Sequence, residues 1–311
     1  MNLGVHQIEK HYIDEHKGQI FCTKLCVNGK CFNILYDYEK KDEISKFVST
    51  FTEYLPYYVY NADTFESFDS KGDISEELKK FSKRCWKGPT VPCRETKVNG
   101  IFGEVFLDFY ERIVKKSKLA VTYASKRDFK SKNENKGFDN VLFSINDGEI
   151  GLVFAEAKFV DSKSSACSSL IKDIKGEPAC GDKKEVIGHL TKGFMNDYVT
   201  FVVEKNALFS DEDKTLLKPF LQELNRVLLN DGDFISFVIE KNIRVDCVFF
   251  AIFKHESVKP SDYIDAYDAI EAEAKIHLDA IGFKNFNIEV VFIPTKARSM
   301  EIKGEINKYY E

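Results

Sequence analysis

The chain has 311 residues, of which 43% are hydrophobic and 31% are charged, and its formal net charge is −5. This composition excludes a disordered or fibrous chain, and the acidic balance argues weakly against a protein that coats nucleic acid. No apolar stretch reaches the roughly 20 residues that a membrane-spanning helix needs. The polar N-terminus has no signal-peptide pattern, so we expect no membrane partner, a cytoplasmic location and reduced cysteines.

The first third of the chain predicts a hairpin followed by two helices. Apolar segments over 21–27 and 31–38 flank Asn28-Gly29, a favoured hairpin turn. Helical spacing of apolar residues follows over 44–54 and 74–85, with a polar loop over 63–73. Gly88-Pro89 and Pro92 break the pattern, so we place a domain boundary near residue 95. Residues 1–95 are then an N-terminal α+β region and a candidate partner-binding surface.

The second region, 96–311, predicts the order helix, three strands, helix. These elements are expected over 103–116, 119–124, 138–145, 149–160 and 164–175. Helices are then expected over 185–204, 211–229 and 261–280, and strands over 234–240, 244–253 and 287–293. The fold class that follows is α/β (α+β), with a mixed central sheet flanked by helices.

Two carboxylates are predicted to face each other across the central hairpin. With Asp147-Gly148 as its two-residue turn, the register places Asp139 directly opposite Glu156, and Lys158 lies on the same face. Directly opposed Cβ atoms are about 4.5–5.5 Å apart, where like charges need a compensating cation. That cation is either a divalent metal or a shared proton, and oxygen ligands favour Mg²⁺ or Mn²⁺ over zinc. The alternative is that these charges mark where the strands reach water.

These residues carry a resemblance to a known superfamily. The order helix, three strands, helix resembles that of the PD-(D/E)xK nucleases. Asp139 on the second strand and Glu156-Ala157-Lys158 on the third match the motif of that superfamily, although Phe138 replaces the proline. A narrower stretch, Val98 to Ile293, resembles the HamA family, the nuclease subunits of the Hachiman anti-phage defence system. The short motifs that carry this likeness are Phe102-Gly103-Glu104, Lys136-Gly137-Phe138-Asp139, Glu156-Ala157-Lys158-Phe159, Ile276-His277 and Val291-Phe292-Ile293-Pro294.

The resemblance implies a restriction-endonuclease-like core with an N-terminal extension. It implies that Asp139, Glu156, the main-chain carbonyl of Ala157 and Glu104 hold Mg²⁺ or Mn²⁺, and that Lys158 orients or helps activate the attacking water. The activity implied is that of a metal-dependent endodeoxyribonuclease, the effector of a bacterial defence system, working with a helicase subunit. For Glu104 an exposed acidic helix face, shared with Asp108 and Glu111, explains the sequence equally well.

Charge is distributed unevenly along the chain. Residues 112–136 contain nine basic residues and two acidic ones, a local balance of +7 that leads into Asp139. We expect this loop to contact the DNA backbone through Lys126, Arg127, Lys130, Lys132 and Lys136; a solvated lysine-rich surface is the alternative. The acidic helix over 261–280 is not expected to touch DNA. The net charge of −5 is therefore the sum over segments of opposite charge, one basic and one acidic.

Other candidate sites are weaker. Cys22, Cys26 and Cys31 lack a usual zinc spacing, and His6, His11 and His16 recur every five residues, which matches neither helix nor strand, so we expect no metal there. No phosphate-binding glycine loop is present, so an ATP-driven motor has to be another chain. The rival interpretations of the whole chain are a non-catalytic DNA-binding or scaffold subunit on a degenerate nuclease fold, and a plain interaction module.

Overall fold

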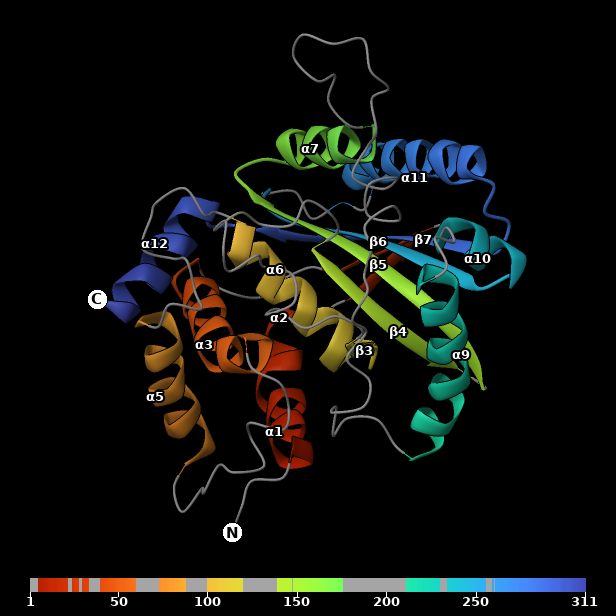
Figure 1. Cartoon of the computed structure of the whole chain (residues 1–311). Helices are drawn as coiled ribbons and strands as arrows, with labels where there is room; N and C mark the ends of the chain where they lie inside the picture. The colour runs from red at the N-terminus through yellow and green to blue at the C-terminus, as the bar shows by residue number, and fades with distance from the viewer. Residues whose placement is uncertain are drawn as a thin grey trace, which may run out of the picture.

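A computed structural model describes residues 5–21, 24–27, 30–33, 40–59, 73–87, 100–119, 139–146, 148–175, 211–229, 234–255, 259 and 261–311. Within them, a mixed sheet has the order β3-β4-β5-β6-β7 (Figure 1). The antiparallel strands are β3 (Lys118–Leu119), β4 (Asn140–Asn146) and β5 (Glu149–Val160). Strands β6 (Arg244–Lys254) and β7 (Phe286–Thr295) continue parallel to β5. The predicted fold class, a mixed sheet flanked by helices, is confirmed.

One face of the sheet is covered by helices from both ends of the chain (Figure 1). They are α1 (Val5–His11), the π-helix η1 (Tyr12–Lys17), α2 (Gly18–Ile20), α3 (Lys40–Val59), α5 (Ile74–Lys87), α6 (Gly100–Phe109), the π-helix η2 (Tyr110–Val114) and α12 (Ser299–Tyr310). Every second side chain of β5 enters this core, namely Val153, Ala155, Ala157 and Phe159. The N-terminal helices therefore share one hydrophobic core with α6.

The opposite face carries α7 (Lys163–Lys175), α9 (Asp211–Leu229), α10 (Phe234–Glu240) and α11 (Ser261–Ile281). Leu152 and Phe154 of β5 pack there. Because side chains alternate along a strand, Glu156 and Lys158 project toward the same face. Helices α7 and α11 lie side by side over it (Figure 1).

Most predicted elements are confirmed, with one clear error. The segment 234–240, expected to be a strand, is the helix α10. Of its described side chains, Phe237 and Val238 are buried, while Ser236, Ile239 and Glu240 are exposed, which is the one-sided pattern of a helix. A short apolar run does not distinguish the two structures. Helix α12 was not predicted.

Several predictions fall wholly or partly outside the described residues. The first hairpin is present as β1 (Lys24–Val27) and β2 (Lys30–Asn33), with Val27 paired to Lys30. The helix expected over 185–204, the loop over 63–72 and most of the strand over 119–124 lie outside. The domain boundary near residue 95 also lies outside and stays a prediction. No described helix is long and apolar enough to cross a membrane.

A buried carboxyl group on η2 predicts a specific pH dependence of stability. Burial, and then the neighbouring Glu289, raises the pKa of Glu111 to about 8. The folded state therefore keeps a proton that the unfolded chain releases, so stability falls as pH rises from about 4.5 to about 8. Replacing Glu111 with glutamine removes this loss and leaves an oxygen for the Ser117 hydroxyl, which now donates to Glu111 Oε2 at 2.9 Å.

We expect Glu111→Gln to raise the melting temperature clearly at pH 8.5 and by much less at pH 5.5. The free-energy difference between the two proteins should change by up to about 1.4 kcal/mol per pH unit within that window. Thermal unfolding at both pH values measures it. An equal difference at the two pH values would show that Glu111 is not the titrating group.

Candidate active site

The site is built where β4 begins and its antiparallel partner β5 continues past it. The ladder runs from Asn146 opposite Glu149 to Asn140 opposite Ala155, which is the register that the sequence predicts. Asp139 directly precedes β4, and its Oδ2 accepts a hydrogen bond from the main-chain N–H of Ala157 at 2.7 Å. This bond fixes the Asp139 carboxylate beside Glu156, since Ala157 is the next residue along β5.

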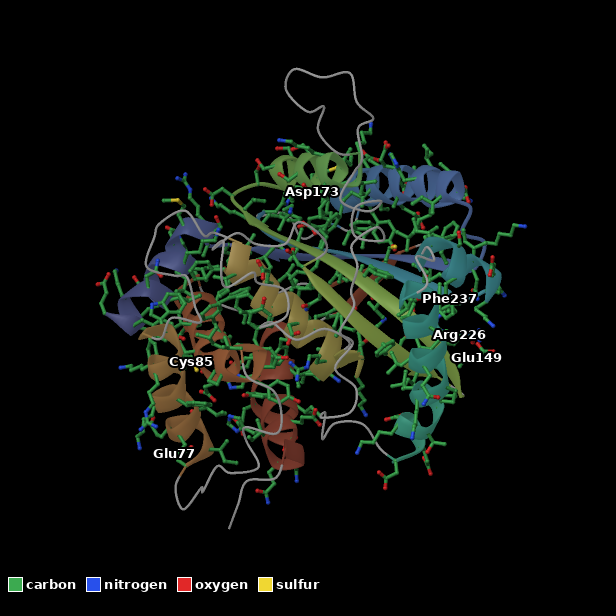
Figure 2. The ribbon with its side chains drawn as sticks, viewed as in Figure 1. Glu77, Cys85, Glu149, Asp173, Arg226 and Phe237 are labelled. Atoms are coloured by element: carbon green, nitrogen blue, oxygen red, sulfur yellow. The ribbon has the colours of Figure 1, made fainter. Side chains whose placement is uncertain are left out.

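Glu156 and Lys158 form an ion pair on the same face of β5. Lys158 Nζ lies 2.6 Å from Glu156 Oε1 and 2.5 Å from Asp173 Oδ2. Asp173 lies on α7 and is labelled in Figure 2. Glu156 is 4% exposed. The structure therefore brings Asp139, Glu156 and Lys158 together as predicted and adds Asp173. Sequence reasoning missed Asp173, because its distance from β5 depends on how α7 folds back over the sheet.

The surroundings of Glu156 disfavour its charged form. Burial, followed by the nearby charges of Asp139 and Asp173, raises the pKa of Glu156 well above its usual value, although Lys158 opposes the shift. Among the described residues, Glu156 Oε2 is a buried oxygen with no hydrogen-bond partner. A buried, unsatisfied carboxylate oxygen is costly. A cation placed between Oε2 and the Asp139 carboxylate would give Oε2 a partner and offset the repulsion between the two carboxylates.

Lys158 remains the charged member of the cluster. Burial would lower its pKa, but Glu156, Asp139 and Asp173 together hold it well above the usual value. An ammonium group in such surroundings donates hydrogen bonds and offers positive charge; it does not accept a proton. It can therefore orient a water molecule or attract a phosphate oxygen.

Glu104 reaches the region from α6, on the other face of the sheet. Helix α6 lies very close to β5 at Gly103, where an added Cβ would lie 3.3 Å from Ala157 Cβ. Glu104 is half-buried, and its Oε2 accepts a hydrogen bond from the Tyr58 hydroxyl of α3 at 2.6 Å. Its carboxylate is thus held by α3, on a helix that contacts the Ala157 segment through Gly103.

The alternative interpretation, an exposed acidic helix face shared by Glu104, Asp108 and Glu111, is wrong. Asp108 and Glu111 are each 1% exposed. Asp108 Oδ2 accepts hydrogen bonds from the Tyr54 hydroxyl at 2.7 Å and from Arg112 Nη1 at 3.1 Å. Its Oδ1 accepts one from Asn140 Nδ2 at 3.2 Å, so this network also holds the start of β4, next to Asp139.

The structure describes only residues 112–119 of the basic segment 112–136. Lys126, Arg127, Lys130, Lys132 and Lys136 lie outside the described residues, and so does Phe138. Two basic residues at the start of the segment have other roles: Arg112 is buried against Asp108, and Lys115 Nζ pairs with Glu289 at 2.8 Å. The local charge excess of the sequence therefore overstates the number of cations available to a ligand.

Fold and site together define an α/β protein in which two carboxylates and a lysine meet at the end of an antiparallel hairpin. The family model HamA matches residues 9–302. The chain belongs to the HamA family and is thus a subunit of a Hachiman defence system, which implies a partner from the same system. Searches among curated proteins and among solved structures find no match for this chain.

Proposed function

We propose that the chain is the metal-dependent nuclease of its Hachiman system and hydrolyses DNA phosphodiester bonds. The observation that carries this proposal is the pairing of Asp139 with Glu156 beside Lys158, with Glu156 Oε2 buried and unpartnered among the described residues. Membership of the HamA family supports a role in defence. The resemblance to PD-(D/E)xK nucleases supports the reaction.

The donor set suits a hard divalent cation. Carboxylate oxygens of Asp139 and Glu156, the main-chain carbonyl of Ala157 and the carboxylate of Glu104 would hold Mg²⁺ or Mn²⁺. When bound, such an ion lowers the pKa of a coordinated water and polarises the phosphodiester as a Lewis acid. The choice of residues fits this role because all the donors are oxygens, with no thiol or imidazole among them.

The chain's own groups would position the reactants. Lys158 is fixed by Glu156 and Asp173, so its ammonium group can orient the attacking water and stabilise charge that develops on the phosphate. The Asp108 network keeps Asp139 at the start of β4. Glu104, held by Tyr58, supports the ion directly or through water.

DNA and a helicase are the partners that we propose. The basic residues Lys126, Arg127, Lys130, Lys132 and Lys136 would contact the phosphate backbone, which supplies affinity without sequence readout. Residues 1–95 would provide the surface for the helicase, and the pair would act in the bacterial cytoplasm.

A comparison of the wild-type chain with Asp139→Ala tests the proposal. Supercoiled plasmid is incubated with each protein in Mg²⁺ or Mn²⁺, with and without the helicase. We expect cleavage by wild type that a chelator stops and that Asp139→Ala lacks. Equal cleavage by both proteins would place the activity elsewhere. DNA binding without cleavage under every condition would instead favour a non-catalytic DNA-binding or scaffold subunit.

A further inference from the structure

A second cluster of ligand-type side chains lies far along the chain from the nuclease candidate. His11 ends α1, His16 lies in η1 and Glu53 lies in α3. The Nε2 atoms of His11 and His16 are 2.8 Å and 2.9 Å from the same oxygen, Glu53 Oε2. The three ligand atoms all lie within 4.8 Å of one another.

The π-helix η1 explains why the sequence pattern did not predict this cluster. A five-residue spacing falls on one side of neither an α-helix nor a strand, but a π-helix closes hydrogen bonds from i to i+5. Because η1 continues directly from α1, His11 and His16 come to the same side, with ring centroids 5.5 Å apart. The five-residue spacing, which argued against a shared site in the sequence, therefore does bring this pair together.

Surrounding groups hold the ligand atoms in place. His16 Nδ1 lies 3.1 Å from the Thr50 hydroxyl, which fixes the ring and leaves Nε2 for Glu53. Glu53 Oε1 accepts hydrogen bonds from the hydroxyls of Ser75 at 2.7 Å and Ser49 at 3.2 Å. Its Oε2 is thereby left to the two imidazoles. Outer hydrogen bonds of this kind orient metal ligands in proteins.

We propose that His11, His16 and Glu53 bind one divalent transition-metal ion of the zinc class. Two imidazoles and one carboxylate form a set that zinc accepts, with the fourth position open. Tetrahedral ligands at about 2.0–2.2 Å from zinc lie about 3.3 Å apart, so each imidazole Nε2 needs to move only about half an ångström away from Glu53 Oε2. A pocket of about 500 Å³, lined also by Glu15 and Asp73, has room for a water or a further oxygen ligand.

The ion would join segments that lie far apart in the sequence. His11 and Glu53 are separated by 42 residues, so the ion would fasten the N-terminal helices to α3. Side chains of α3 also reach α6: Tyr58 bonds Glu104 at 2.6 Å. Metal binding would thus stabilise the layer against which the proposed nuclease site is built.

Zinc binding to the full chain tests the proposal. The protein is stripped with a chelator, and Zn²⁺ is titrated in competition with a chromophoric chelator. We expect one tight equivalent in wild type and in Asp139→Ala, together with a rise in melting temperature. His16→Ala should weaken affinity by more than the 10–100-fold typical of losing an outer-shell partner. His11→Ala, at a side chain that is 13% exposed, repeats the test with less risk to folding.

A matched control is His277→Ala. His277 pairs with Glu273 at 3.2 Å on α11, so this variant also loses a histidine–glutamate contact but leaves the cluster intact. We expect its zinc affinity to equal that of wild type. The proposal is overturned if wild type binds no tight zinc, if both cluster variants bind as well as wild type, or if Asp139→Ala abolishes binding. The first of these results would show that the cluster is a hydrogen-bonded contact between two histidines and a glutamate and not a metal site.

Discussion

Replacing Lys158 with alanine should reduce metal-dependent DNA cleavage by about a hundred- to a thousand-fold, the usual effect of removing one group that stabilises transition-state charge. Lys158 is the cation that lies between Glu156 and Asp173, at 2.6 Å and 2.5 Å. Without it the ligand carboxylates remain, so Mn²⁺ binding should persist while the rate falls. Initial rates on supercoiled plasmid, together with a Mn²⁺ titration, measure the two effects separately.

Two further variants separate chemistry from folding. Lys158→Arg keeps a positive charge between the two carboxylates, so we expect wild-type stability with a reduced rate, because the guanidinium does not reproduce the position of the ammonium. Lys175→Ala removes a lysine from α7 that pairs with Glu273 at 3.0 Å, and should cleave at the wild-type rate. Wild-type cleavage by Lys158→Ala would remove this lysine from the mechanism.

The largest stability effect is expected at Asp108. Asp108→Ala leaves Arg112, whose side chain is 3% exposed, as a buried charge without its carboxylate. It also removes the acceptor for Tyr54 and Asn140. Breaking one side of a buried ion pair costs about 3–5 kcal/mol, a large part of a typical total of about 5–15 kcal/mol. Urea unfolding of the purified chain gives the difference.

Controls for this prediction use a double variant and an exposed pair. Asp108→Leu combined with Arg112→Met removes both charges, so it should recover much of the loss, as replacing whole buried ion pairs often does. Glu305→Ala breaks the exposed Lys308–Glu305 pair of 2.6 Å and should change the free energy of unfolding by less than about 1 kcal/mol. A loss at Asp108 no larger than that at Glu305 would mean that the network contributes little.

The sequence predicts the central hairpin well because its information is local. Asp147-Gly148 fixes the turn, and side-chain alternation then determines which residues share a face, so Asp139 and Glu156 could be paired without a structure. The same reasoning failed over 234–240, where a short apolar run fits either a strand or the helix α10. Tertiary packing, which local patterns do not contain, decided that segment.

Contacts between distant segments were beyond sequence reasoning. Asp173 reaches Lys158 only because α7 packs over β5, and Tyr58 reaches Glu104 only because α3 packs on α6. The pairing of His11 with His16 depends on a π-helix, a rare element with hydrogen bonds from i to i+5 that the apolar pattern does not reveal. Asp108 looked like a surface acid because helical spacing alone does not reveal burial.

The most direct test of the nuclease assignment is a time course of plasmid cleavage by the chain in complex with its helicase partner. The assignment predicts cleavage in Mg²⁺ that stops on chelation, resumes when Mg²⁺ is restored and is absent when the complex carries Glu156→Gln. A wild-type complex that binds the plasmid and unwinds it in Mg²⁺ or Mn²⁺ but leaves every phosphodiester intact would contradict it.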